Sequence, residues 1–199
     1  MKSRSQPILA FTDVSDLEAH MAGQPADGEG FWLKLAKAGA PEATITKAQA
    51  IEAALRHGWI DGQLDAYDEH YFLTRMTPRR AASRWSAKNR ETAERLLEAG
   101  RIKPNGLAQI EAAKQDGRWE AAYPSQGKAE PPADLQAALA ANPAAQRFFE
   151  TIDRANRYSI IYRVNDAKKP ETRAKRIADY VAMLARGETL HPSRKTAGV

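Results

Sequence analysis

The chain has 199 residues and a net charge of +5; 43% of the residues are hydrophobic, 28% are charged and none is cysteine. This length can bury the core of one large domain or of two small ones. The lack of cysteine excludes disulfide scaffolds, thiol catalysis, zinc–thiolate sites and cysteine-ligated iron–sulfur clusters.

The N-terminal segments alternate between strand-like and helix-like patterns. An apolar stretch of about five residues follows the first basic residues, which is too short for a secretory signal or a membrane span, so we expect a cytoplasmic protein. The pattern then predicts a strand over 7–12, a helix over 13–23 and a strand over 30–39.

The next segments predict a capped helix followed by a β-hairpin. Thr46 and Gln49 fit a capping box, and Gly58 suits the left-handed residue that often ends a helix. The segments 59–64 and 70–76 are rich in aromatic and apolar residues and flank a short acidic linker, which is typical of a hairpin. Asp61 precedes a glycine inside the first of these strands, which indicates a bulge or a close approach.

Beyond the hairpin the pattern becomes helical. Ser86 is a good N-cap for a helix that runs to Ala99, and Asn142 with Pro143 marks another helix start. The sequence therefore predicts an α+β fold with four parts: an N-terminal domain with a small, mainly antiparallel sheet and helices (1–117), a linker (118–132), an all-helical section (133–187) and a mobile basic tail (188–199).

Several motifs resemble one bacterial family. They are GWIDG (58–62), TPRRAASRWSAKN (77–89), AGRIKPNGL (99–107), PPADLQAALAANPAAQRFFE (131–150) and KKPETRAKRIA (168–178). In this order they resemble the YdeI/OmpD-associated family, also labelled bacteriocin-protection proteins, over nearly the whole chain. The resemblance implies an N-terminal α+β domain with a helical C-terminal section, and a role in stress or bacteriocin tolerance.

Chemistry-bearing residues are concentrated between residues 57 and 89. Arginines lead into the helix that starts near Ser86, and a helix N-terminus with arginines beside it favours a phosphate or carboxylate. We expect tryptophans to wall this site, and Asp61 and Asn89 to orient polar groups. The candidate ligand-binding residues are Trp59, Asp61, Arg75, Arg79, Arg80, Trp85, Ser86 and Asn89.

Simpler structural roles stay open for each of these residues. Asn89 could bond to the backbone of the GWIDG turn and only hold the hairpin in place, and Asp61 could form a structural ion pair. The arginines could form a solvated basic turn. With these roles the segment is mainly a structural junction, and anion binding is an additional role that we expect for it.

Two other functions remain possible. One is nucleic-acid binding through two basic blocks, residues 75–103 and the C-terminal block that comprises Lys168, Lys169, Arg173, Lys175 and Arg176. The other is an enzyme that uses Asp61 or His70 as acid or base.

No catalytic residue, metal site or cofactor is assigned from the sequence. The acidic linker near His70 matches neither a calcium loop nor a zinc pattern. The favoured hypothesis is a non-enzymatic binding protein of YdeI/OmpD-associated type with a small-anion or protein-binding site at the 59–89 junction. Its partner is unknown.

Overall fold

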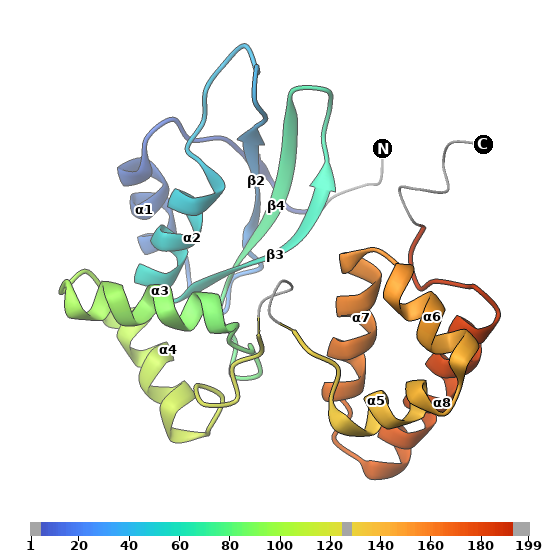
Figure 1. Ribbon diagram of the computed structural model, residues 1–199. Helices are drawn as coiled ribbons and strands as arrows, with labels where there is room; N and C mark the ends of the chain where they lie inside the picture. The colour runs from blue at the N-terminus through green and yellow to red at the C-terminus, as the bar shows by residue number, and fades with distance from the viewer. Residues whose placement is uncertain (1–4, 125–128, 193–199) are drawn as a thin grey trace. The chain divides into compact units, whose positions relative to one another are not determined.

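The computed structural model describes residues 5–124 and 129–192 (Figure 1). The chain divides into two compact units, Met1–Tyr123 (unit 1) and Pro124–Val199 (unit 2). The described part of unit 1 combines a four-stranded sheet with helices, whereas that of unit 2 is helical. The predicted α+β fold is confirmed.

The sheet has the strand order β1-β2-β4-β3. Strand β1 is parallel to β2, while β2–β4 and β3–β4 are antiparallel, as the mainly antiparallel prediction required. The first strand is shorter than the predicted 7–12; beyond it, the carbonyl of Phe11 accepts a hydrogen bond from the Ile45 amide. The strands are β1 (Ile8–Leu9), β2 (Phe31–Ala36), β3 (Trp59–Ala66) and β4 (Tyr71–Pro78).

The hairpin of β3 and β4 contains the irregularity that its sequence predicted. Asp61 pairs with Met76 and Leu64 pairs with Thr74, so the register shifts between Asp61 and Leu64. Such a bulge bends the strand and redirects nearby side chains. It determines where the Asp61 carboxylate lies.

Two helices, α1 (Val14–Ala22) and α2 (Lys47–Arg56), cover one face of the sheet (Figure 1). The predicted capping box starts α2. The Thr46 hydroxyl accepts a hydrogen bond from the Gln49 backbone amide, and the Gln49 side chain accepts one from the Thr46 backbone amide. The core between these helices and the sheet contains Leu17, Met21, Phe31, Leu33, Leu35, Ala53, Trp59 and Met76.

A second core of unit 1 lies around α3 (Ala87–Glu98) and α4 (Pro104–Gln115). The Ser86 hydroxyl caps α3 by accepting from the Asn89 amide, as predicted. Trp119 is 5% exposed, and its ring lies 4.8 Å from that of Trp85. Residues 118–123, which the sequence placed in a linker, therefore pack against unit 1, because Trp119 buries its indole there.

Helix α4 begins directly against the end of α2. Gly58 ends α2 with a φ of 75°, and a Cβ on this residue would lie 2.8 Å from the Asn105 carbonyl oxygen. Gly106 is buried in the first turn of α4, and a Cβ there would lie 2.7 Å from the Leu55 carbonyl oxygen and closer still to that of Arg56. The lack of side chains at both glycines allows this contact.

Gly106→Ala should destabilise unit 1 by about 1–3 kcal/mol, because the added methyl group overlaps the α2 backbone. The effect should appear despite the better helix propensity of alanine. Denaturant unfolding followed by tryptophan fluorescence measures it, with the exposed Glu111→Ala of the same helix as control. An unchanged free energy of unfolding would contradict the close contact.

His57 lies at the end of α2 in a mostly buried ion-pair cluster. Its side chain is 11% exposed, and its Nε2 lies 3.7 Å from a Glu18 carboxylate oxygen; Glu18 also pairs with Arg56. Burial lowers the pKa of His57 below its usual 6.5, partly opposed by Glu18. The folded protein therefore favours the neutral imidazole.

This lowered pKa predicts that unit 1 loses stability in mild acid. The unfolded chain takes up a proton as the pH falls through about 6.5, whereas the folded chain resists it, so protonation favours unfolding. The free energy of unfolding should fall more between about pH 7.5 and 5.5 for the native chain than for His57→Gln. Equal losses in the two proteins would show that His57 does not contribute.

Unit 2 consists of four helices around its own core in its described part. Leu190 packs against this core, and the backbone of His191 exchanges two hydrogen bonds with the buried amide of Asn156. The start of the expected mobile tail (188–199) is thus attached to unit 2, and residues 193–199 lie outside the described residues. The helices are α5 (Ala133–Ala140), α6 (Pro143–Thr151), α7 (Arg154–Asn165) and α8 (Pro170–Ala185).

Candidate functional site

A cavity of about 580 Å³ in unit 1 lies where the first turns of α2 and α3 meet the bulged part of β3. This volume is within the range of small-molecule sites. Its lining mixes charged, polar and apolar side chains: Lys47, Ala48, Ile51, Ile60, Asp61, Gly62, Ser86, Lys88, Asn89 and Tyr123.

Three of the predicted site residues come together in this cavity. The bulge in β3 contributes Asp61, and the start of α3 contributes Ser86 and Asn89. The α3 start is held by Tyr123, whose carbonyl accepts from the Ala87 amide and whose amide donates to the Trp85 carbonyl. Segments far apart in the sequence thus fix one site.

The helix starts leave backbone donors at the cavity. Within the described residues, the amides of Lys47, Ala48 and Lys88 have no hydrogen-bond acceptor, whereas their neighbours Gln49 and Asn89 donate to the capping hydroxyls. Free amides and the positive end of the helix dipole favour anions. Two such ends on one cavity give it a positive character.

The Asp61 carboxylate is the negative group of the cavity. It is 18% exposed and lies 3.6 Å from the Lys47 Nζ, which is an ion pair but too long for a good hydrogen bond. Among the described residues no donor forms a hydrogen bond with it. Asn89 likewise makes no side-chain hydrogen bond there, so the proposed bond from its amide to the GWIDG backbone is not formed.

Arg79 is a buried cation close to this cavity. It is 4% exposed, and its guanidinium lies 3.6 Å from the centroid of the Trp85 ring. Its Nη1 donates to the Arg84 carbonyl, but its Nε and Nη2 have no hydrogen-bond partner. Burial lowers the pKa of Arg79 to about 10, opposed by Tyr123 and Asp61, so it stays protonated at neutral pH.

The other predicted site residues do not line the cavity. Trp59 and Trp85, expected as its walls, are 4% and 1% exposed, because each packs into one of the two cores of unit 1. Arg75 donates to the Glu29 carbonyl and lies beside the Trp32 ring. Arg80 is exposed in the turn that precedes α3.

Lys47, Lys88 and Tyr123 line the cavity but were not among the residues predicted from the sequence. The two lysines occupy the first turns of helices whose N-caps were recognised, so a signal for them existed at each helix start. Nothing local in the sequence showed that the two starts would face one cavity. Tyr123 fell in the segment that was expected to be a linker.

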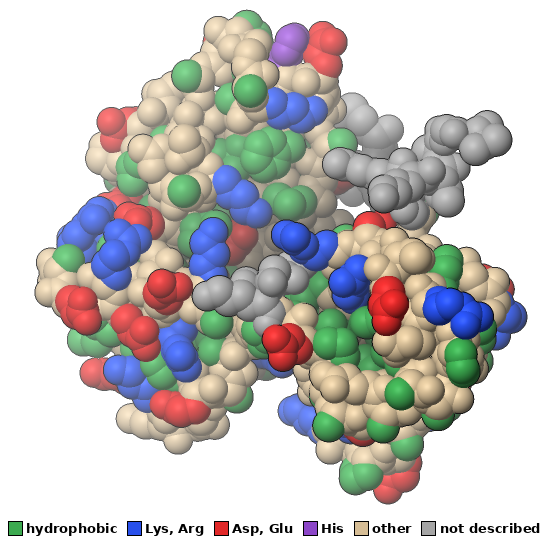
Figure 2. All heavy atoms as spheres, viewed as in Figure 1, with side chains coloured by type: hydrophobic (Ala, Val, Ile, Leu, Met, Phe, Trp, Pro, Cys, Tyr) green, Lys and Arg blue, Asp and Glu red, His purple; other side chains and the backbone are tan. Residues whose placement is uncertain are grey.

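The C-terminal basic block is largely paired within unit 2. Arg173 forms two hydrogen bonds with the Asp134 carboxylate, Lys175 pairs with Asp179, and Arg176 pairs with Asp166. Lys168 and Lys169 are exposed. Figure 2 shows blue and red side chains interspersed on this face of both units.

His70 lies at the tip of the hairpin, away from the cavity lining. Its Nε2 is 3.2 Å from a carboxylate oxygen of Glu69, and its side chain is 44% exposed. It therefore does not converge with Asp61. Within residues 5–124 and 129–192, no group of three or more His, Asp or Glu side chains is arranged to hold a metal ion.

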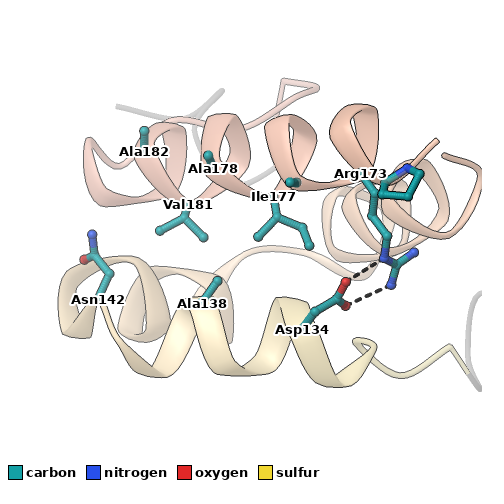
Figure 3. A pocket seen from close by; sticks show the side chains of 10 residues that line it. Asp134, Ala138, Asn142, Arg173, Ile177, Ala178, Val181 and Ala182 are labelled. Carbon is teal, nitrogen blue, oxygen red and sulfur yellow. Dashed lines mark hydrogen bonds and ion pairs between the residues drawn. The ribbon is translucent and has the colours of Figure 1, made fainter.

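Unit 2 has a groove of its own, of about 690 Å³, between α5 and α8. Figure 3 shows Ile177 and Val181 of α8 facing Ala138 of α5, with the Asp134–Arg173 pair toward one end. The groove is apolar apart from this satisfied ion pair and Asn142. It offers shape but little polar chemistry for a small charged ligand.

Comparison with protein families divides the chain in the same way. Residues 9–109, just over half of the chain, match the model of a domain of unknown function (DUF8412). The chain belongs to this family. A second model, described as bacteriocin-protection, YdeI or OmpD-associated, matches residues 128–187.

The second match confirms the resemblance to the YdeI/OmpD-associated family but corrects its extent. The resemblance was expected over nearly the whole chain, whereas GWIDG and TPRRAASRWSAKN fall within the DUF8412 match. No curated protein and no solved structure matches the chain. Among the described residues, no helix has the length and apolar character needed to cross a membrane.

Replacing Arg79 with methionine should change the free energy of unfolding by no more than about 1 kcal/mol, or increase it. A buried charge with unsatisfied donors is costly, and an apolar side chain of similar length removes that cost. Denaturant unfolding followed by tryptophan fluorescence tests this, with the exposed Arg80→Met as control. A loss above about 3 kcal/mol would show that the guanidinium is a structural requirement.

Proposed function

We propose that unit 1 binds a small anion in the cavity between α2, β3 and α3. The observation that carries this proposal is that two helix N-termini open on one cavity, each with a lysine and at least one amide that has no acceptor among the described residues. Backbone amides, lysines and helix dipoles are the usual means of binding phosphate or carboxylate. The proposal assigns this chain a binding activity and no catalytic step.

The balance of charge supports an anion. Lys47 and Lys88 line the cavity, and the buried Arg79 interacts electrostatically with Asp61 and Tyr123, which also line it. Asp61 is the one acidic side chain among the lining residues. Three cations against one carboxylate leave a positive potential at a partly enclosed site, where salt screens it less than at an open surface.

The alternatives have weaker support. Nucleic-acid binding would use the two basic blocks. In residues 75–103, three arginines pair with Glu52 or Glu94, and in the C-terminal block three of the five cations are paired. The enzyme hypothesis named Asp61 or His70 as acid or base, and His70 lies at the hairpin tip, away from the cavity lining that contains Asp61. A protein partner would fit a hollow site less well than a small ligand. A role in bacteriocin or stress tolerance rests only on the YdeI/OmpD-associated family's description.

Phosphate binding provides the test. All four tryptophans, residues 32, 59, 85 and 119, belong to unit 1, so tryptophan fluorescence reports on the unit that holds the cavity. Inorganic phosphate at about 10 mM should raise the melting temperature of the full chain relative to chloride of equal ionic strength. Lys88→Ala should weaken binding about five- to ten-fold, because one charge contact is lost.

The matched control is Lys169→Ala, which removes the same charge from an exposed position in the C-terminal basic block. It should leave phosphate affinity unchanged. An unchanged melting temperature of the native chain in phosphate, or equal losses in the two variants, would overturn the assignment of an anion site to this cavity.

A further inference from the structure

The Asp61 carboxylate is a feature that a simple anion does not explain. It repels phosphate, yet it lies in the cavity and is only 18% exposed. Among the described residues it pairs with the Lys47 ammonium but accepts no hydrogen bond, so its oxygens can accept one from a ligand. A ligand that carries its own donor would supply this hydrogen bond.

The neighbours of Asp61 indicate which kind of donor fits. The Lys47 ammonium lies 3.6 Å from the carboxylate, and the Arg79 guanidinium interacts with it electrostatically. A ligand ammonium would add a third cation beside these two. A ligand hydroxyl donates to the carboxylate without adding charge, so hydroxyl groups suit this corner better.

The rest of the lining is compatible with a hydroxylated carbon chain. The Asn89 side chain lines the cavity and is not engaged by other described residues, so it can donate and accept. Ile51 and Ile60 provide apolar contacts for carbon-bound hydrogens. The volume of about 580 Å³ exceeds what phosphate alone needs.

We infer that the ligand of this cavity is a polyol phosphate, whose phosphate binds the helix starts at Lys47 and Lys88 and whose hydroxyl groups bind Asp61 and Asn89. This inference rests on the proposed anion-binding function and deepens it. Asp61 is then the specificity residue: it disfavours a bare anion and selects one that carries hydroxyl groups.

The experiment compares three ligands with the same phosphate group: inorganic phosphate, glycerol 3-phosphate and phosphoethanolamine. Calorimetric titrations use the full native chain and its Asp61→Ala variant. Glycerol 3-phosphate should bind the native chain about ten-fold or more tightly than either other ligand, as expected for a hydrogen bond to a charged group. Asp61→Ala should weaken the binding of glycerol 3-phosphate about ten-fold and strengthen the binding of inorganic phosphate.

Opposite changes for two ligands in one variant cannot come from misfolding. Asp65→Ala is the matched control, because it removes a carboxylate of β3 that does not line the cavity. It should not produce opposite changes in the affinities for glycerol 3-phosphate and inorganic phosphate. A second variant, Asp61→Asn, retains a carbonyl acceptor and should keep part of the preference for glycerol 3-phosphate.

The other outcomes separate the two proposals. If none of the three ligands binds the native chain, the proposed anion-binding function fails and the inference fails with it. If inorganic phosphate binds as tightly as glycerol 3-phosphate, or Asp61→Ala weakens both equally, anion binding stands and the polyol inference is overturned. Tightest binding of phosphoethanolamine, dependent on Asp61, also overturns it in favour of a zwitterion.

Discussion

The stacking of Arg79 on Trp85 connects the two halves of unit 1. Arg79 directly follows β4, and its amide donates to the Gly58 carbonyl at the end of α2. Trp85 precedes the N-cap of α3 and packs edge-on against Trp119. This guanidinium–indole contact therefore joins the core under the sheet to the core around α3 and α4. The cavity lies where these two halves meet.

A buried arginine at this junction has an electrostatic consequence. Its guanidinium is almost inaccessible to water, and two of its nitrogens lack hydrogen-bond partners. An apolar side chain could pack here at a lower desolvation cost, so packing alone does not account for a charged residue at this position. It adds a positive charge close to Asp61 and Tyr123 that salt screens weakly.

The cavity retains several polar groups that the fold does not satisfy. The amides of Lys47, Ala48 and Lys88, the Asp61 carboxylate and the Asn89 side chain lie there without hydrogen bonds from the described residues. The caps Thr46 and Ser86 satisfy only the Gln49 and Asn89 amides at these two helix starts. Polar groups that remain open to a hydrogen bond on a cavity are the groups that a ligand can engage.

The sequence by itself determined the local structure, because its signals act within a few residues. The capping box at Thr46, the N-cap at Ser86, the helix end at Gly58, the hairpin and its bulge at Asp61 were all predicted and found. Only the tertiary structure decided which helix starts share a cavity. It thereby added Lys47 and Lys88 to the candidate site. It also turned Trp59 and Trp85 inward, because burying a large indole in a core stabilises more than exposing it at a site. Local patterns specify helix ends and turns, but burial and convergence depend on contacts between segments far apart in the chain.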